Sequence, residues 1–272
     1  REIGLVIHQI ANPFNAEVIS GVSDLLEAEG YLVSVLDSRD DPEKEARNLE
    51  AFIRNARGGL LWVPSAEHAP RTTDLLQTHR IPTVTFLRRL PEMTFDHVGI
   101  ENHAATYLAT SYLADLGHYN FCYFGGMGAG QVREERLAGC IAALADRGLP
   151  PPVIWESPDS KLSALDAALA LRIAHPETTA LICNGDMVAL GACLALTRLG
   201  LIAGKDMSVI GFDDISDAAV ATPPLTTMAV SPHQLGLKLA RVLLDRISDP
   251  TTPIVNHTAT ATLVVRGTTG PA

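Results

Sequence analysis

Short apolar runs alternate with amphipathic helical segments, and this alternation constrains the fold more than any other feature of the chain. In the first part, the segments that predict strands are almost wholly apolar and span 3–7, 32–36, 59–63 and 83–86. Continuous apolar runs of this length are typical of parallel strands that are covered on both faces. Between them, Ile19, Val22 and Leu26 recur at helical spacing before Gly30, and Asp41 precedes a second helix. This part of the chain therefore predicts a parallel sheet built from βαβ units.

The same alternation restarts in the second part of the chain. Strands are expected at 121–124, 152–155, 180–183 and 208–211, with helices at 132–145, 162–174 and 187–199. Two consecutive series of this kind predict an α/β fold with two doubly wound parallel-sheet lobes. A long helix at 232–247 follows, with strands at 253–258 and 262–265, and we assign this helix back to the first lobe.

This assignment gives two discontinuous lobes. The N-terminal lobe is expected to comprise 1–101 plus 232–258, and the C-terminal lobe 102–231 plus 259–272. The chain would then cross between the lobes near Glu101, Ser231 and Thr258. Three such connections form a hinge, and a cleft between hinged lobes is a natural place for a ligand.

Composition excludes several classes of function. The 272 residues are 47% hydrophobic and 19% charged, which is typical of a soluble globular protein, and no apolar run reaches the roughly 18 residues that span a bilayer. The net charge is −10, without a block of Lys and Arg, so this surface is not expected to hold nucleic acid. The four cysteines lack CxxC spacing and predict buried reduced thiols, as suits a cytoplasmic protein.

A pair of carboxylates, Asp213 and Asp214, directly follows the strand at 208–211 and its aromatic neighbour. In open α/β sheets, ligands bind at the carboxyl ends of the strands. We expect Asp213 to face the cleft, where a carboxylate can accept two hydroxyl protons of a sugar or nucleoside, and Asp214 to cap the next helix. Asp186, which also follows a strand, is either a capping and dipole partner or a ligand contact.

Two further segments follow strands of the predicted lobes. Asn12 and Pro13 predict a helix start, after which Phe14 could offer a flat apolar face to a sugar ring and Asn15 could hydrogen-bond hydroxyls. The alternative is a helix start without a ligand. Arg136 is either a surface charge or a fork that donates to ligand oxygens or to Asp213.

Other motifs give no sign of chemistry. The glycine-rich segment 125–130 lacks the Lys-Ser/Thr pair of a Walker A loop and the GxGxxG spacing of a dinucleotide fold, so a flexible strand-to-helix loop is expected. There is no GxSxG, HExxH or metal-spaced Cys/His cluster, and His118 is expected to be structural at a helix end. No catalytic residue, cofactor or metal is therefore expected, and an α/β enzyme is the weakest hypothesis.

Taken together, these segments resemble the effector-binding region of the lactose/galactose repressor (LacI/GalR) family over essentially the whole chain. The matching pieces are IGLVI, NPF, GLLWVPS, LGH, RLAG, GDMVALGA, MSVIGFDDI, PPLTT and VRGTT, in this order. The resemblance implies the fold of type I periplasmic binding proteins. Members carry an N-terminal helix-turn-helix domain and a hinge helix ahead of this region, which these 272 residues do not include. Operator DNA would be bound only through that domain, by a homodimer.

The resemblance also implies a set of ligand contacts. Carried over to this chain, they are Phe14, Asn15, Glu101, Asn102, Arg136, Asp186 and Asp213. A second aromatic is common in the family where Asn15 stands, and an Asp where Glu101 and Leu87 stand, so the ligand is not identified by these positions.

The leading hypothesis is therefore a cytoplasmic sensor of a small polar effector, most simply a sugar or sugar derivative, bound between the lobes and coupled to DNA affinity through the change in lobe arrangement. The alternative is a periplasmic sugar-binding protein of a transport system, which would share the fold. The family pieces and the lack of a signal segment favour the regulator.

Overall fold

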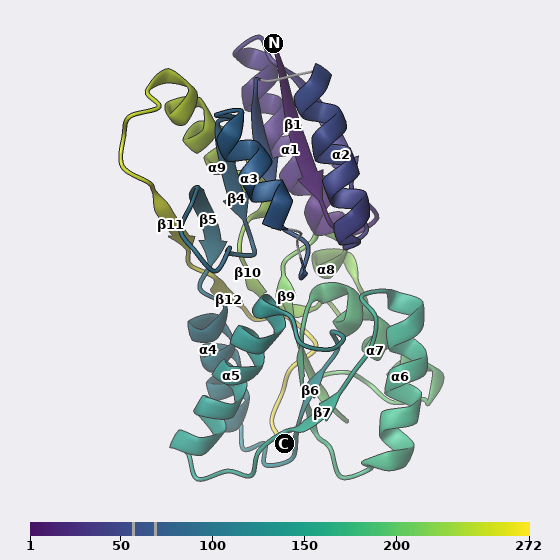
Figure 1. The fold of residues 1–272 in the computed structure, drawn as a ribbon. Coiled ribbons are helices and arrows are strands. Elements are labelled where there is room, and N and C mark those ends of the chain that lie inside the picture. Colours follow the sequence, from purple (N-terminus) through teal and green to yellow (C-terminus); the bar gives the residue numbers. More distant parts are fainter. Residues whose placement is uncertain (56–57, 68–69) are drawn as a thin grey trace. The chain divides into compact units, whose positions relative to one another are not determined.

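The computed structural model describes residues 1–55, 58–67 and 70–272, which fall into two compact units (Figure 1). Unit 1 comprises Arg1–Ile100 and Ser231–Ala259, and unit 2 comprises Glu101–Val230 and Thr260–Ala272. The chain therefore passes from one unit to the other three times, and each passage lies one residue from the predicted lobe boundary. No helix in the described residues is long and apolar enough to cross a membrane.

Unit 1 contains a six-stranded sheet in the order β11-β5-β4-β3-β1-β2, and all of its pairings are parallel. Its strands are β1 (Glu2–Ile7), β2 (Leu32–Asp37), β3 (Gly59–Trp62), β4 (Thr83–Phe86), β5 (Asp96–Ile100) and β11 (Asn256–Ala259). Its helices are α1 (Pro13–Ala28), α2 (Pro42–Asn55), α3 (Pro70–Thr78) and α9 (Pro232–Ser248).

Unit 2 repeats this plan with the order β12-β10-β9-β8-β6-β7. Its strands are β6 (Phe121–Phe124), β7 (Val153–Trp155), β8 (Ala180–Cys183), β9 (Ser208–Asp213), β10 (Thr226–Ala229) and β12 (Thr262–Val264). Its helices are α4 (Asn102–Asp115), α5 (Gln131–Asp146), α6 (Lys161–Ala174), α7 (Asp186–Arg198) and α8 (Ser216–Val220). Only the pairing of β12 with β10 is antiparallel among the described strands.

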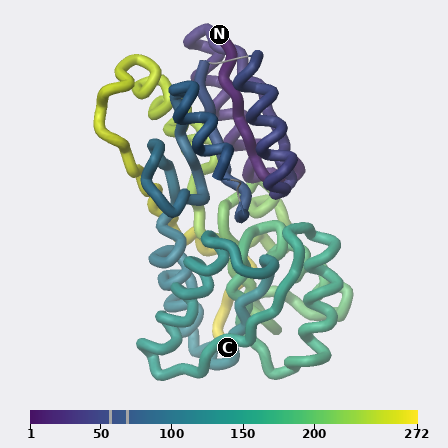
Figure 2. Tube along the Cα trace, in the orientation of Figure 1, coloured from purple at the N-terminus to yellow at the C-terminus, as the bar shows by residue number. Residues whose placement is uncertain are grey.

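The predicted fold class is confirmed, because helices cover both faces of each sheet. Right-handed crossovers place α1 on one face of the first sheet and α2 and α3 on the other, since the chain reverses its direction across the sheet after β2. The helix α9 packs against α1, and α4 against α5 in the same way in unit 2. Figure 2 shows the lime-coloured end of the α9 segment in the same unit as the purple N-terminal segment, although the two are far apart in the sequence. This reversal creates a switch point between β1 and β3, and another between β6 and β8.

Glycines let the paired helices approach to backbone contact. A Cβ at Gly139 of α5 would lie 2.2 Å from the His103 carbonyl oxygen of α4, and one at Gly21 of α1 would lie 2.1 Å from the His233 carbonyl oxygen of α9. A Cβ at Gly191 of α7 would lie 2.5 Å from the Lys161 carbonyl oxygen of α6. No larger residue fits at these positions unless the helices move apart.

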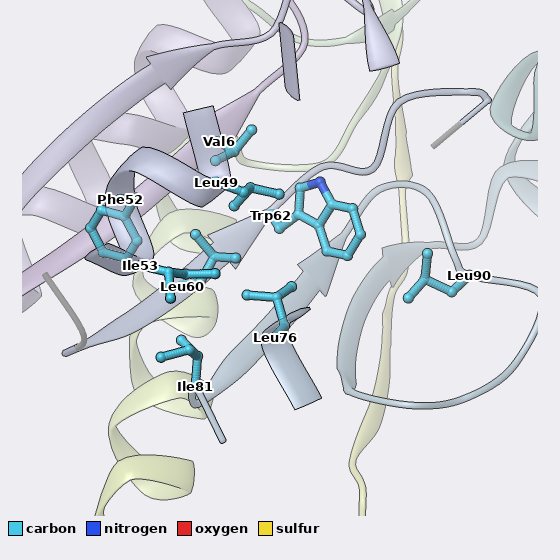
Figure 3. Close-up of a cluster of buried hydrophobic side chains, with 9 residues drawn as sticks. All are labelled: Val6, Leu49, Phe52, Ile53, Leu60, Trp62, Leu76, Ile81 and Leu90. Atoms are coloured by element: carbon cyan, nitrogen blue, oxygen red, sulfur yellow. The ribbon is translucent and has the colours of Figure 1, made fainter. Parts of the chain in front are cut away.

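A cluster of buried side chains fills the α2 and α3 side of the first sheet (Figure 3). Its members are Val6, Leu49, Phe52, Ile53, Leu60, Trp62, Leu76, Ile81 and Leu90. Most of these residues come from strands that are apolar on both faces and from the apolar stripes of the two helices, whereas Ile81 and Leu90 come from the loops before and after β4. The Trp62 indole occupies the centre of this group in Figure 3 and is fully buried.

Several local predictions are confirmed. The Asn12 side chain accepts a hydrogen bond from the Phe14 amide and caps α1, with Pro13 as the first helical residue. His118 is structural: its ring nitrogens lie 2.9 Å from Thr179 Oγ1 and 3.0 Å from Ser208 Oγ, so it joins the end of α4 to the sheet. The four cysteines are free thiols, of which Cys193 is half-buried and the other three are buried.

Candidate functional site

Three loops follow neighbouring strands of unit 2 at the switch point of its sheet. They are 125–130 after β6, Asn184 and Gly185 after β8, and Asp214 and Ile215 after β9. The loop after β6 is the strand-to-helix connection that the sequence predicts. Arg133 fixes it by donating from Nε to the Gly125 carbonyl oxygen (3.2 Å) and from Nη1 to the Gly128 carbonyl oxygen (3.0 Å).

Arg136 lies in the second turn of α5, and its guanidinium is held on several sides. Its Nε donates to Asn102 Oδ1 at 2.9 Å, and its Nη1 donates to the Asn184 carbonyl oxygen. The guanidinium carbon lies 3.5 Å from the centre of the Phe212 ring, which is a cation–π contact. With only 6% of the residue exposed, Arg136 is a positioned group, and the alternative of a surface charge is wrong.

Asp213 ends β9 next to this guanidinium. Its Oδ1 lies 3.9 Å from Arg136 Nη2, which is an ion pair at the outer limit of contact. Its backbone φ is +115°, a strained value for a residue with a side chain, and such strain concentrates at functional positions. A Cβ at Gly185 would lie 3.5 Å from Asp213 Oδ2, so the glycine leaves the space beside this oxygen open.

Asp186 is the first residue of α7 and directly follows Gly185, which borders the Asp213 carboxylate. It is fully buried; its Oδ2 accepts from the Ile215 amide (2.9 Å) and its Oδ1 from Thr227 Oγ1 (2.6 Å). Burial raises the pKa of this carboxyl to about 7, the neighbouring Asp214 charge adds to the rise, and the two hydrogen bonds oppose it. No part of Asp186 is exposed, so in this structure it holds the Ile215 amide and the Thr227 hydroxyl, and its predicted contact with a ligand stays a prediction.

The prediction that Asp214 caps the next helix is wrong. The cap position of α8 belongs to Ile215, without a side-chain cap. Asp214 instead accepts from Arg266 Nη1 at 2.7 Å, and Arg266 also donates to the Leu225 carbonyl oxygen. This arginine lies 52 residues further along the chain, so local sequence gave no sign that it would take the carboxylate.

The residues predicted at the first crossing differ in role. Asn102 is 3% exposed, accepts from Arg136, and donates from Nδ2 to Glu135 Oε2 at 2.9 Å. It therefore orients the guanidinium. Glu101 is exposed at the cap position of α4, and its side chain makes no cap hydrogen bond. The structure thus brings Asn102, Arg136 and Asp213 together and leaves Glu101 on the surface of unit 2.

In unit 1, the predicted residues Phe14 and Asn15 lie in the first turn of α1, at the carboxyl end of β1. Both are buried, with exposures of 5% and 1%. Asn15 Nδ2 donates to the Gln9 carbonyl oxygen at 2.6 Å. Its Oδ1 is buried and accepts no hydrogen bond from the described residues. A buried acceptor of this kind is unusual and is available to a donor brought by a ligand or water.

A second polar group at the carboxyl edge of the unit 1 sheet was not predicted from the sequence. Arg88, after β4, donates from Nη2 to Asp40 Oδ2 at 3.1 Å, and its Nη1 binds Asp40 Oδ1 and the Pro64 carbonyl oxygen. Burial and, after it, the Arg88 charge lower the pKa of the adjacent His8 to about 4. His8 is therefore neutral at physiological pH. The available signal was position, because these residues follow strands β1, β2 and β4 at their carboxyl ends.

The chain matches the family model of the periplasmic binding protein-like domain over residues 110–269. The HTH-type transcriptional repressor PurR of Haemophilus influenzae (strain PittEE) is 30% identical over 250 residues, which cover 91% of this chain and 74% of the repressor. The chain belongs to the LacI/GalR family.

Other members of the family agree with this assignment. The maltose regulon regulatory protein MalI of Escherichia coli (strain K12) is 26% identical over 96% of this chain and 80% of its own length. The crystal structure of a LacI family transcriptional regulator from Enterococcus faecalis V583 with bound ribose superposes with a TM-score of 0.90 at 26% identity, over 100% of both chains. The relatives of this LacI/GalR chain are thus transcription regulators.

The charges at the unit 2 edge of this LacI/GalR chain are nearly balanced by the protein itself. Arg133 Nη2 lies 3.7 Å from Glu156 Oε1, and Arg136 Nη2 lies 3.9 Å from Asp213 Oδ1, so each guanidinium has a carboxylate beside it. No group of three or more His, Cys, Asp or Glu side chains within residues 1–55, 58–67 and 70–272 has the arrangement of a metal site. The edge is therefore suited to hydrogen bonding with an uncharged ligand.

Proposed function

We propose that this chain is the ligand-sensing region of a LacI/GalR transcription regulator and that it binds a small uncharged sugar or sugar derivative. The observation that carries this proposal is the Arg136–Asp213 pair at the carboxyl edge of the unit 2 sheet. Asn102 and Phe212 hold the arginine in place, and the strained backbone of Asp213 holds the carboxylate beside it.

Hydroxyl groups suit this arrangement better than anions do. A carboxylate accepts up to two hydroxyl protons, and an adjacent guanidinium nitrogen donates to a neighbouring sugar oxygen. A phosphate or carboxylate on the ligand would meet Asp213 without an unpaired cation to neutralise it, because Glu156 and Asp213 already offset the charges of Arg133 and Arg136. The ribose-bound E. faecalis regulator supports the same class of ligand.

The predicted contacts Phe14 and Asn15 remain part of the proposal. They occupy the corresponding edge of the first sheet, and the unsatisfied Asn15 Oδ1 can accept a hydroxyl proton. Glu101 also remains a predicted contact, since it is exposed.

Calorimetric titration with a defined panel tests the proposal: D-ribose, D-galactose, cellobiose and D-ribose 5-phosphate. We expect an uncharged member to bind and the phosphate to bind more weakly. Asp213→Asn should lower the affinity about 10- to 100-fold, because a hydrogen bond to a charged acceptor contributes about 1.5–3 kcal/mol. Glu134→Gln, on an exposed position of the same helix as Arg136, serves as the matched control and should bind like the wild type. Absence of binding by all the uncharged sugars to the folded protein would overturn the proposal.

The regulator hypothesis includes assembly and DNA recognition. We propose a homodimer, tested by sedimentation at micromolar concentration, and DNA contact through residues outside these 272, because a surface with a net charge of −10 repels phosphate. A regulator of this kind works where the DNA is, in the cytoplasm. The relatives favour this function over sugar delivery to a transporter and over catalysis, since those named above are regulators.

A further inference from the structure

A fully buried carboxylate, Glu45, lies behind the carboxyl edge of unit 1. It belongs to α2 and is 0% exposed. Burying a carboxylate without hydrogen bonds is costly, so its partners must account for its place there. Those partners come from the end of β3 and the loop after it, not from the helix that carries Glu45.

Three donors from this segment converge on the carboxylate. The Trp62 indole Nε1 and the Ser65 amide both donate to Oε2, at 2.9 and 2.7 Å, and Ser65 Oγ donates to Oε1 at 3.1 Å. The backbone before them is fixed to the sheet, since the Val63 amide donates to the Val6 carbonyl oxygen. The carboxylate therefore determines where residues 63–66 lie.

This loop in turn holds the polar group at the edge of unit 1. The Pro64 carbonyl oxygen accepts from Arg88 Nη1 at 3.1 Å, and the Ala66 amide donates to Asp40 Oδ1 at 3.2 Å. Arg88 and Asp40 bind each other through both carboxylate oxygens. The contacts thus run without a break from Glu45 through the loop to a guanidinium at the edge where ligands of this fold class bind.

We propose that Glu45 is a positioning residue: it acts through the loop 63–66 to fix the Arg88–Asp40 pair at the carboxyl edge of unit 1 and thereby sets the affinity of that edge for ligand. The affinity part of this inference rests on the proposed sugar-sensing function, and the positioning part does not.

The hydrogen-bond pattern predicts different effects for two substitutions of Glu45. Both N–H donors fall on Oε2, whereas Oε1 faces a hydroxyl that can either donate or accept. A glutamine with its oxygen in the Oε2 place and its amide nitrogen in the Oε1 place satisfies all three partners. Glu45→Gln should therefore keep the loop in place, whereas Glu45→Met, of similar volume, leaves three buried donors without an acceptor.

Amide hydrogen exchange on the whole protein tests the positioning. We expect Glu45→Met to speed exchange about 10-fold or more in peptides covering residues 60–66, and measurably in those covering 37–41 and 86–90. Glu45→Gln and the matched control Glu50→Met, on the same helix but 42% exposed in its side chain, should leave all three regions as in the wild type. If Glu45→Met does not fold, Ser65→Ala, which removes only the Oγ donor, replaces it and should show the same pattern with a smaller increase.

Two results would overturn the positioning role. One is faster exchange confined to residues 60–66, which would show that the effect stops before Arg88. The other is Glu45→Gln behaving like Glu45→Met, which would show that hydrogen-bond geometry is not what holds the loop.

The affinity part of the proposal is tested by calorimetric titration with the panel sugar that binds best to the wild type. A loss of about 10-fold in Glu45→Met, with Glu45→Gln within about 2-fold of the wild type, supports the proposal; equal affinity in all variants overturns it. If the wild type binds no panel sugar, the proposed function fails, and the exchange data still decide whether Glu45 positions the loop.

Discussion

Replacing Asp186 by asparagine should remove a pH dependence from the stability of unit 2. In the folded protein, burial raises the pKa of this carboxyl from 3.8 to about 7. Between these values the folded state binds a proton that the unfolded state does not, so the free energy of unfolding falls as pH rises. The stabilisation is fully present below pH 3.8 and is lost as pH rises through about 7.

The magnitude follows from the size of the shift. A rise of about 3 pH units corresponds to about 4 kcal/mol of unfolding free energy, at about 1.4 kcal/mol for each unit. Asparagine at position 186 has no proton to lose. Its Oδ1 can accept from the Ile215 amide and its Nδ2 can donate to Thr227 Oγ1, because that hydroxyl can turn to accept. Relative to that of the wild type, the free energy of unfolding of the variant should therefore rise by up to about 4 kcal/mol between pH 4 and pH 8.

The two tryptophans make the measurement specific to each unit. Trp62 lies in unit 1 and Trp155 in unit 2, so Trp62→Phe leaves a single tryptophan, whose fluorescence reports on unit 2. Urea unfolding of that protein, with and without Asp186→Asn, is followed from pH 4 to pH 8. A stability difference between the two proteins that stays constant over this range would refute the reasoning, because it would mean that Asp186 is ionised in the folded state throughout.

Three further predictions concern packing, a buried ion pair and the thiols. Gly139→Ala should destabilise unit 2 by about 1–3 kcal/mol in urea unfolding, since its Cβ meets a backbone oxygen of α4; equal or higher stability would contradict the helix contact. Arg246→Met should cost unit 1 about 3–5 kcal/mol, because it leaves the Asp96 carboxylate, with a fully buried side chain, without its bidentate partner; Trp62 fluorescence in Trp155→Phe measures it. The buried thiols of Cys122, Cys140 and Cys183 should react with a disulfide reagent at pH 8 only after unfolding, because burial raises the pKa of all three, that of Cys140 to about 12; rapid reaction of more than the half-buried Cys193 in the native protein would be inconsistent with this burial.

The elements that sequence predicted best are those whose apolar runs end abruptly. The strands β6 and β8 have the predicted bounds because polar residues or glycine flank each run. The strand β5 was missed because Asp96 and His97 interrupt its pattern. Both are nevertheless buried, since Arg246 binds the aspartate and Thr85 Oγ1 lies 2.9 Å from His97 Nδ1. Local periodicity does not record partners that come from 150 residues away.

The parts of the candidate site that sequence predicted also have local signals, and the parts that it missed depend on partners far along the chain. Asp213 was found because it lies at the carboxyl end of a strand, and Arg136 because it lies on the helix after β6; the sheet order then brings them together. The burial of Asp186 was not predictable, because it depends on Thr227 and Ile215, which fold over it from later elements. The Arg88–Asp40 pair was missed for the same reason, as 48 residues separate its members.

The C-terminal segment completes both sheets within a few residues: β11 adds to β5 of unit 1, and β12 then adds to β10 of unit 2. A premature stop codon shortly after α9 would therefore strip an edge strand from both halves at once and expose two unpaired backbone edges, a recognised route to aggregation. Dividing the gene at any single point yields neither half intact. Expression of one half alone requires joining its separated pieces, and such a splice, rather than a truncation, is the rational way to ask whether either half folds by itself.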